Sequence, residues 1–284
     1  MIDQNLRRVE GIIKKGGVRP ITYDIVWDTQ EPTDKLILFA HGFKGFKDWG
    51  IWNAVADEFA RNGIAFMKMN FSHNGTTLDH LEDFTDLEAF GKNNFTREIN
   101  DIKRVVVALD EDAVELPKAF SELEFTLIGH SRGGASAIIA ASELNGAIDK
   151  LVTWAAIDDI ASRYGEFDEN WKKEGVKFET NGRTGQQMPL YFQLYRDILA
   201  NQQRFDLEKA LKDFSIPMLI CHGDADPTVD VTAAFNLNNF NIDADLLIVK
   251  GGNHVFGGSH PFLESSLPLP MQEVIIKTVD FIND

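Results

Sequence analysis

The sequence contains a single cysteine, Cys221, and no Cys/His cluster with the spacing of a zinc site. An internal disulfide is therefore excluded, and we expect no metal. No segment approaches the roughly 18 consecutive apolar residues that a membrane-spanning helix needs. The first residues, MIDQNLRRVEGIIKK, also lack the apolar core of a secretory signal. These absences indicate a soluble protein of the cytoplasm.

Basic residues are scarce as well. The 284 residues include 28 Lys and Arg against 44 Asp and Glu, which gives a formal net charge of -16. A surface of this sign repels phosphate backbones and anionic lipid, so we expect neither nucleic acid nor a membrane as a partner. No P-loop and no G-x-G-x-x-G opens a helix after a strand, so we expect no nucleotide and no other cofactor.

What the sequence does contain is a regular alternation of short apolar runs and longer amphipathic stretches, typical of a mostly parallel sheet flanked by helices. The expected strands are 35–40, 64–71, 125–128, 150–157, 217–221 and 246–250. The expected helices are 51–62, 95–109, 133–144, 207–214, 232–239 and 270–282. The segment before residue 29 is expected to add antiparallel strands at one edge. The fold class is therefore α/β.

One segment interrupts this rhythm after the strand 150–157, which is the sixth strand when two strands of the N-terminal edge are counted. Residues 158–205 contain no continuous apolar strand but many aromatic side chains, and the turn signal at 181–185 predicts a hairpin. We therefore divide the chain into a core, 1–157 and 206–284, and an inserted lid or cap, 158–205. A packing unit remote from any site is the alternative. The lid aromatics, with Trp171, Tyr191 and Tyr195 as pocket candidates, favour a substrate with an apolar or aromatic part.

The residues 129–134, Gly-His-Ser-Arg-Gly-Gly, lie between an expected strand and an expected helix. This is G-x-S-x-G in the context where a sharp strand-to-helix turn lifts the hydroxyl of Ser131 above the sheet edge. The flanking glycines are needed because side chains there would collide with the neighbouring strand and helix. At this motif the chain resembles the α/β-hydrolase fold family. The resemblance extends from residue 35 to residue 284, apart from the lid.

The resemblance implies a catalytic triad in the order Ser, acid, His. HGDADPTV at 222–229 is similar to the family's acid loop and assigns the acid to Asp226, and GGNH at 251–254 assigns the base to His254. Other groups stay open at this point. The rival acids are Asp224, Asp158 and Asp159, and the rival base is His260.

The family also implies an oxyanion hole. The turn His41-Gly42-Phe43 after the first buried strand is expected to supply the backbone N–H of Phe43, and Arg132 the second N–H. His41, Gly42 and Trp49 are further pocket candidates, although His41 is also expected to tie down the turn. An ion pair with an acid such as Asp158 is expected for the side chain of Arg132.

The implied activity is that of a serine hydrolase, most simply a carboxylic ester hydrolase of class EC 3.1.1.- acting on a small-molecule ester. An aminopeptidase or acyl-peptide hydrolase with the same triad is the alternative. A non-catalytic ligand-binding relative is a more distant one. A serine in the motif argues against the dehalogenases and epoxide hydrolases of this fold, which carry an aspartate there. The oligomeric state is left open by the sequence.

Overall fold

The computed structural model describes residues 5–30, 33–144, 146–212 and 214–284. Its strands are β1 Leu6–Ile13, β2 Ile21–Asp28, β3 Lys35–Ala40, β4 Ala65–Met69, β5 Glu124–His130, β6 Lys150–Trp154, β7 Val176–Thr180, β8 Gln187–Tyr191, β9 Met218–Gly223 and β10 Asp245–Val249. Its α-helices are α1 Trp52–Arg61, α2 Leu87–Lys92, α3 Phe95–Asp110, α4 Arg132–Glu143, α5 Ile160–Tyr164, α6 Glu169–Glu174, α7 Gln193–Ala200, α8 Leu207–Lys212, α9 Thr232–Phe240 and α10 Leu269–Asn283. A 3₁₀ turn spans Phe120–Glu122.

Eight strands form one twisted sheet in the order β1-β2-β4-β3-β5-β6-β9-β10. From β4 to β10 all neighbours are parallel, whereas β1 pairs antiparallel with β2 and β2 with β4. The mostly parallel sheet and the antiparallel edge predicted from the sequence are both confirmed. Residues 1–4 of the expected edge segment and residue 213 of the expected helix 207–214 lie outside the described residues.

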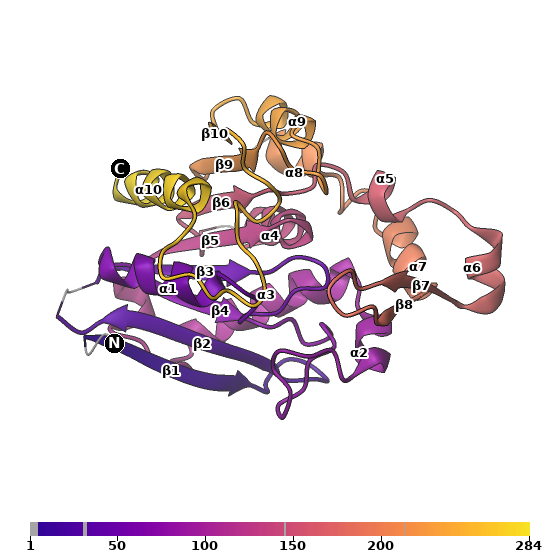
Figure 1. The fold of residues 1–284 in the computed structure, drawn as a ribbon, viewed down its shortest axis with the longest axis horizontal. Coiled ribbons are helices and arrows are strands. Elements are labelled where there is room, and N and C mark those ends of the chain that lie inside the picture. The colour runs from indigo at the N-terminus through magenta and orange to yellow at the C-terminus, as the bar shows by residue number, and fades with distance from the viewer. Residues whose placement is uncertain (1–4, 31–32, 145, 213) are drawn as a thin grey trace.

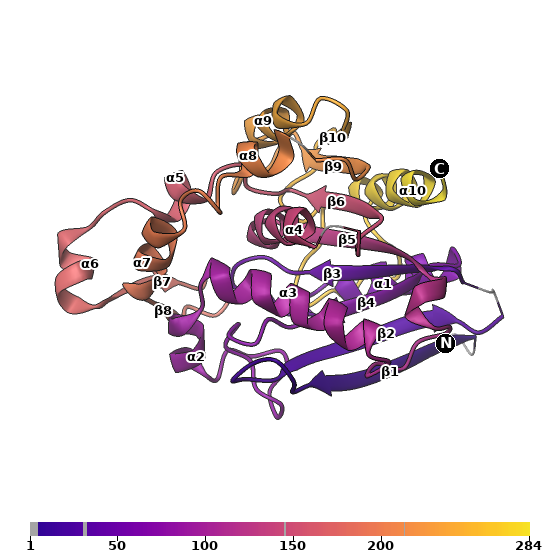
Figure 2. The same cartoon turned by 180° about the vertical axis from the view of Figure 1, so that it is seen from behind.

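Helices cover both faces of the sheet (Figures 1 and 2). One face carries α1 and α10, which pack on a buried cluster centred on Phe39, Trp52 and Trp154. The other face carries α3, α4, α8 and α9 over a second, larger apolar cluster. The β3 run Leu36–Ala40 is fully buried, because a central parallel strand is covered on both sides. No helix in the described ranges is long and apolar enough to cross a membrane.

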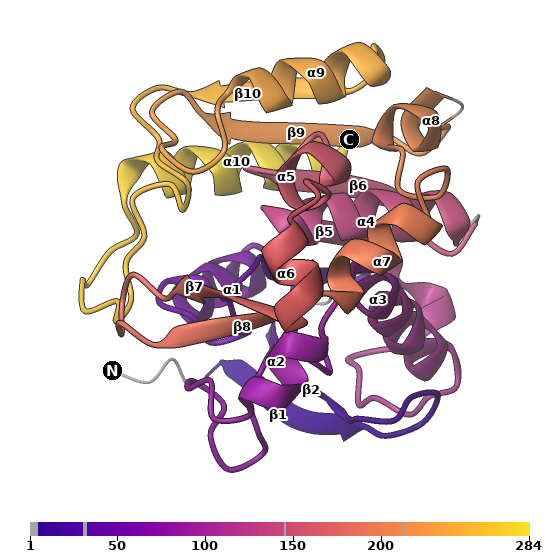
Figure 3. The same ribbon diagram turned by 90° about the vertical axis from the view of Figure 1, so that its right-hand side faces the viewer.

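Residues 158–205, called the insertion below, lie between β6 and β9 in sequence and at one end of the molecule (Figures 1 and 3). It consists of α5, α6, the antiparallel hairpin β7–β8 expected around residues 181–185, and α7. The side chain of Asp197 on α7 caps the start of α3 by accepting from the Thr96 backbone N–H at 3.1 Å. Gln186 donates to the backbone carbonyl of Phe84 at 2.9 Å. The insertion is therefore fastened to the core on the side of α2 and α3.

Candidate active site

Ser131 occupies a sharp turn between β5 and α4. Its backbone has φ 56° and ψ -122°, a combination that L-residues adopt only under strain. The turn is held because the Ser131 N–H donates to the carbonyl of Trp154 at 2.9 Å. A Cβ on Gly133 would lie 2.3 Å from the carbonyl oxygen of His41, so only glycine lets α4 approach the end of β3 this closely. The sequence-based reason for these glycines is confirmed.

Ser131, His254 and Asp226 form a continuous hydrogen-bonded chain. The Nε2 atom of His254 lies 3.0 Å from the Oγ of Ser131, and its Nδ1 lies 2.7 Å from Oδ2 of Asp226. The serine follows β5, the aspartate follows β9 and the histidine follows β10, so all three project from the carboxyl edge of the parallel sheet. The side chain of His254 remains 18% exposed while that of Asp226 is buried. The histidine is therefore partly accessible to a ligand, whereas the aspartate is not.

The carboxylate of Asp226 is surrounded by donors. Its Oδ1 accepts from the backbone N–H groups of Thr228 and Val229, at 2.7 and 3.0 Å. Burial acts to raise the pKa of this carboxyl, but interactions with His222 and His254 outweigh burial and hold the pKa far below its usual range. Asp226 is therefore ionised at neutral pH. A buried anion beside Nδ1 favours the tautomer in which Nδ1 carries the proton and Nε2 is free to accept one.

The rival acids and the rival base are engaged elsewhere. Asp224 accepts from the N–H of Gly251 at 2.6 Å and so anchors the loop that leads to His254. Asp158 accepts from the side chain of Asn236 at 2.6 Å, and Asp159 caps the start of α5. His260 accepts from the N–H of Gly50 at 2.7 Å and stacks on Trp49.

The loop 41–50 lies against the serine turn. A Cβ on Gly42 would come within 2.8 Å of the Ser131 Cβ, which shows how closely the two backbones approach. As the first residue of α4, Arg132 has a backbone N–H without an intrahelical acceptor. The positive end of α4 points to the same place. Phe43, the residue after Gly42, and Arg132, the residue after Ser131, stay the expected oxyanion donors.

Two further histidines lie beneath the site. His130 contacts the His254 backbone carbonyl through Nε2 at 2.8 Å, and His41 contacts the carbonyl of Gly42 through Nδ1 at 2.8 Å. Burial lowers the pKa of His130 to about 3 and that of His41 to about 4. Both rings are therefore neutral at pH 7, and their contacts support the His254 loop and the loop 41–50.

The remaining pocket candidates are Trp49 in the loop 41–50 and three aromatic residues of the segment 158–205. Trp49 packs between Trp52 and the ring of His260. Trp171 is buried within the insertion and donates from Nε1 to the Leu190 carbonyl at 2.7 Å. Tyr191 donates to Glu88 on α2, and Tyr195 stacks on Phe192. Their role in a pocket stays a prediction.

Arg132 forms an ion pair with a buried acid as expected, but the suggested partner, Asp158, is wrong. The Nε atom of Arg132 lies 2.9 Å from the Oε1 atom of Glu98 on α3, and both side chains are buried. Asp158 lies on the segment after β6, whereas the guanidinium of Arg132 extends from α4 toward α3. Helix α3 carries several acids and only its packing on α4 selects Glu98, so the sequence alone could not identify this partner.

Sequence reasoning also gave no role to His222. Its Nε2 lies 2.9 Å from the Val229 carbonyl and 3.4 Å from the Oδ2 atom of Asp226, so it fixes both ends of the acid loop. The signal available in the sequence was the position of His222, four residues before Asp226 in HGDADPTV. In the structure this histidine is fully buried and supports the carboxylate.

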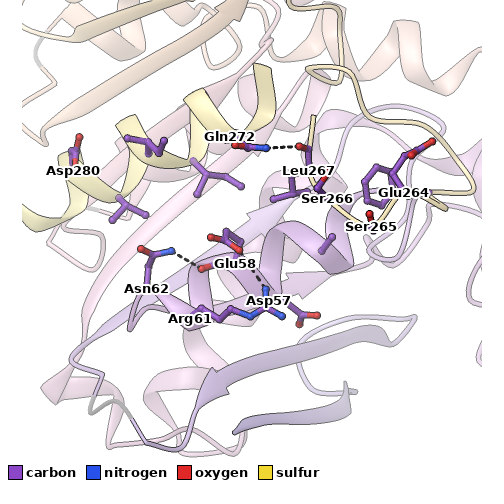
Figure 4. A pocket seen from close by; sticks show the side chains of 15 residues that line it. Asp57, Glu58, Arg61, Asn62, Glu264, Ser265, Ser266, Leu267, Gln272 and Asp280 are labelled. Atoms are coloured by element: carbon purple, nitrogen blue, oxygen red, sulfur yellow. Dashed lines mark hydrogen bonds and ion pairs between the residues drawn. The ribbon is translucent and has the colours of Figure 1, made fainter. Parts of the chain in front are cut away.

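A cavity of about 600 Å³ lies away from this site, between α1, α10 and the segment 262–267 (Figure 4). Its lining is rich in carboxylates, from Asp57, Glu58, Glu264 and Asp280, with Arg61 beside them. None of the three hydrogen-bonded residues lines it, so it is not the space that a substrate of Ser131 would fill. Among the described residues there is no group of three or more His, Cys, Asp or Glu side chains that could hold a metal ion.

No protein-family model matches the sequence, and no curated protein sequence matches it either. Solved structures do match over nearly the whole chain. Est1E from Butyrivibrio proteoclasticus is 20% identical with a TM-score of 0.68, covering 97% of this chain and 99% of that one. A structure of Est1E with ferulic acid bound is 19% identical, with a TM-score of 0.70 and coverage of 96% and 98%.

Alpha/beta hydrolase domain-containing protein 10 from mouse is 16% identical, with a TM-score of 0.68 and coverage of 97% and 98%. Together with the sheet order, these likenesses show that the chain has the α/β-hydrolase fold. The fold implied by the sequence resemblance is confirmed.

Proposed function

We propose that this protein is a serine hydrolase that cleaves carboxylic esters through an acyl-enzyme, with Ser131 as nucleophile, His254 as base and Asp226 as the residue that orients the base. The observation that carries the proposal is the unbroken chain from Ser131 Oγ to His254 to the buried Asp226 carboxylate, at 3.0 and 2.7 Å. A serine hydroxyl is a weak nucleophile until a positioned imidazole accepts its proton. The strained turn at Ser131 supports the proposal, because it holds that hydroxyl 3.0 Å from the imidazole Nε2.

In the first half of the reaction the Ser131 Oγ attacks the ester carbonyl carbon while His254 Nε2 takes the hydroxyl proton. The carbonyl oxygen becomes an anion that accepts from the backbone N–H groups of Phe43 and Arg132. The tetrahedral intermediate collapses when the carbon–oxygen bond to the alcohol breaks and His254 protonates the departing oxygen. The alcohol leaves and the acyl group remains on Ser131.

In the second half a water molecule attacks the acyl carbon and gives a proton to His254. Collapse returns that proton to Ser131 Oγ and releases the carboxylic acid. Asp226 stays ionised throughout and stabilises the imidazolium that forms in each half. Its strongly lowered pKa supports this role, because a carboxyl that stays ionised keeps its negative charge beside the imidazolium and does not take the ring's proton.

We further propose that residues 158–205 form a cap over this site and that the acyl pocket accepts an apolar or aromatic group. The aromatic side chains of the insertion support the proposal, since Tyr164 lies 6.1 Å, ring to ring, from Phe43 in the oxyanion loop. The structural neighbour with ferulic acid bound makes a hydroxycinnamate ester a reasonable member of a substrate series.

The test is hydrolysis of p-nitrophenyl esters from acetate to laurate, together with methyl ferulate and aminoacyl p-nitroanilides. Ser131→Ala is the blank. Ser142→Ala is the matched control, because Ser142 is an exposed serine on α4, the helix that follows Ser131. Its hydroxyl donates to the Ile139 carbonyl. We expect ester turnover in wild type and Ser142→Ala and none above background in Ser131→Ala. Turnover of the anilides alone would identify a peptidase instead. Equal ester turnover in Ser131→Ala would refute the proposal.

A further inference from the structure

The guanidinium of Arg132 is enclosed by three aromatic rings. Its central carbon lies 4.1 Å from the ring centre of Phe95, 5.0 Å from that of Tyr164 and 5.6 Å from that of Phe43. The side chain is only 2% exposed. Cation–π attraction is strongest for such a desolvated cation, so this cage is a stable arrangement and not a chance surface contact.

The buried carboxylate of Glu98 is the ion-pair partner of that guanidinium. It lies 2.9 Å from Arg132 Nε and also accepts from Ser136 at 2.9 Å and from Asn93 at 2.7 Å. Burial acts to lower the pKa of Arg132, but Glu98 and then Tyr164 outweigh it and raise the pKa. The cation is permanent, and its two nearest partners, Glu98 and Phe95, both belong to α3.

The three rings come from three separate parts of the molecule. Phe95 belongs to α3, Phe43 to the loop after β3, and Tyr164 to α5 in the insertion. Arg132 itself follows Ser131 directly. The two residues assigned to the oxyanion hole are thus joined side chain to side chain, and one residue of the insertion packs on both.

A second contact joins the insertion to the same loop. Lys44, the residue after Phe43, lies 3.2 Å through Nζ from the Thr180 carbonyl in β7 and 5.2 Å from the centre of the Phe43 ring. Lys44 has φ 55°, so the backbone just past Phe43 is strained and needs external support. Gly42 on the other side contributes no side chain at all. The position of the Phe43 N–H therefore depends on the cage and on the insertion.

We propose that the side chain of Arg132 positions the oxyanion hole, and that the insertion acts on catalysis through the contact of Tyr164 with Arg132 and Phe43. The inference rests on the proposed function, since it concerns the donors assigned to that reaction. Arg132 and Tyr164 are positioning residues here because neither side chain touches the reacting atoms. Oxyanion donors must sit within about 0.5 Å of their productive place, so a small loss of support lowers the rate of the chemical step.

Two substitutions test this. Arg132→Lys keeps a cation for Glu98 but loses the planar face that stacks on the rings. Arg104→Lys is its matched control, because Arg104 is a partly buried arginine, 10% exposed, that pairs with the buried acid Asp101 at 2.7 Å but contacts no residue of the cage. Tyr164→Leu removes the ring from the insertion. Gln186→Ala is its control, because it loses a different contact between insertion and core.

The readouts are kcat and KM for the best ester, the inhibition constant of a trifluoromethyl ketone that mimics the oxyanion, and the melting temperature. For Arg132→Lys and Tyr164→Leu we expect kcat to fall about 10- to 100-fold with KM within about threefold, since one oxyanion donor contributes about 10²- to 10³-fold. Affinity for the ketone should fall by the same factor as kcat/KM. Arg104→Lys and Gln186→Ala should lower the melting temperature without lowering kcat.

The positioning role is overturned if Arg132→Lys and Tyr164→Leu retain the wild-type kcat. It is equally overturned if kcat falls in all four variants in proportion to their loss of stability. Either result leaves the proposed function intact, provided that wild type turns over and Ser131→Ala does not. A wild type that neither turns over esters nor binds the ketone would overturn the proposed function and this inference together.

Discussion

Replacing Asp226 by asparagine changes one atom and reverses the hydrogen-bond polarity at His254. The Oδ1 atom of Asp226 accepts from two backbone N–H groups, those of Thr228 and Val229. The asparagine oxygen must take that place, because an NH₂ group there would face two donors. The amide NH₂ then replaces Oδ2 and faces His254 Nδ1 at about the present 2.7 Å. A donor there forces the proton of the imidazole onto Nε2, which can no longer accept the proton of Ser131.

The expected loss follows from that tautomer change. The same exchange in the serine-protease triad lowers kcat about 10⁴-fold, equivalent to about 5.5 kcal/mol of transition-state stabilisation. Asp224→Asn is the matched control two residues away. Its side chain accepts from the Gly251 N–H at 2.6 Å, a bond that an amide oxygen also makes. We expect that variant to keep kcat within about threefold of wild type.

The assay is hydrolysis of the preferred p-nitrophenyl ester by both variants, with the circular dichroism spectrum and melting temperature as checks of folding. A kcat that falls by 10³-fold or more in Asp226→Asn alone supports the tautomer argument. If Asp224→Asn were the more damaged protein, the acid would have to be reassigned to Asp224. If both variants turned over normally, His254 would need no orienting carboxylate and the reasoning would be refuted.

Three further outcomes are expected from the same structure. Burial acts to raise the pKa of Asp48, but two buried lysines outweigh burial and lower this pKa from 3.8 to about 2. The ionised group therefore stabilises the fold above pH 4, and this stabilisation is lost as the pH falls through 2. The unfolding free energy, measured while the pH is lowered from 4 to below 2, should therefore fall by about 2 kcal/mol less in Asp48→Asn than in wild type. Cys221 is buried and its thiol pKa is raised by burial, so iodoacetamide should label it only after unfolding; labelling of the native protein would contradict this. Gly42→Ala should lower kcat at least tenfold, because the new Cβ would lie 2.8 Å from the Cβ of Ser131. Gly182→Ala, which has open space around it, should leave kcat unchanged. Equal kcat values in the two variants would contradict the close approach of Gly42 to the serine turn.

Much of the fold could be read from the sequence because burial on both faces leaves a plain signal. Leu36–Ala40 is a continuous apolar run and Phe125–Ile128 is apolar apart from Thr126, and both lie in central parallel strands. The short helix α2 was not anticipated, since six residues carry too little periodicity and only the cap by Asp86 marks its start. The hairpin β7–β8 was found by its turn residues and not by its strands.

The parts of the site that form local sequence motifs were more predictable than the contacts between elements that are distant in sequence. The motifs around Ser131, Asp226 and His254 are local, so their residues could be named before their distances were known. The contacts of Arg132 were not predictable in this way, because Glu98 and Tyr164 are distant in sequence and meet it only through the packing of α3, α4 and the insertion. Contacts made by packing between elements leave no local pattern.

The most direct test of the central claim is covalent labelling with a fluorophosphonate, followed by mass spectrometry of the intact protein and of its peptides. The reagent reacts with a serine whose hydroxyl is activated by a neighbouring base. We predict one adduct per chain, on Ser131, formed equally in wild type and Ser142→Ala and absent from Ser131→Ala. An unlabelled wild type, or an adduct that persists in Ser131→Ala, would contradict the assignment of Ser131 as the nucleophile.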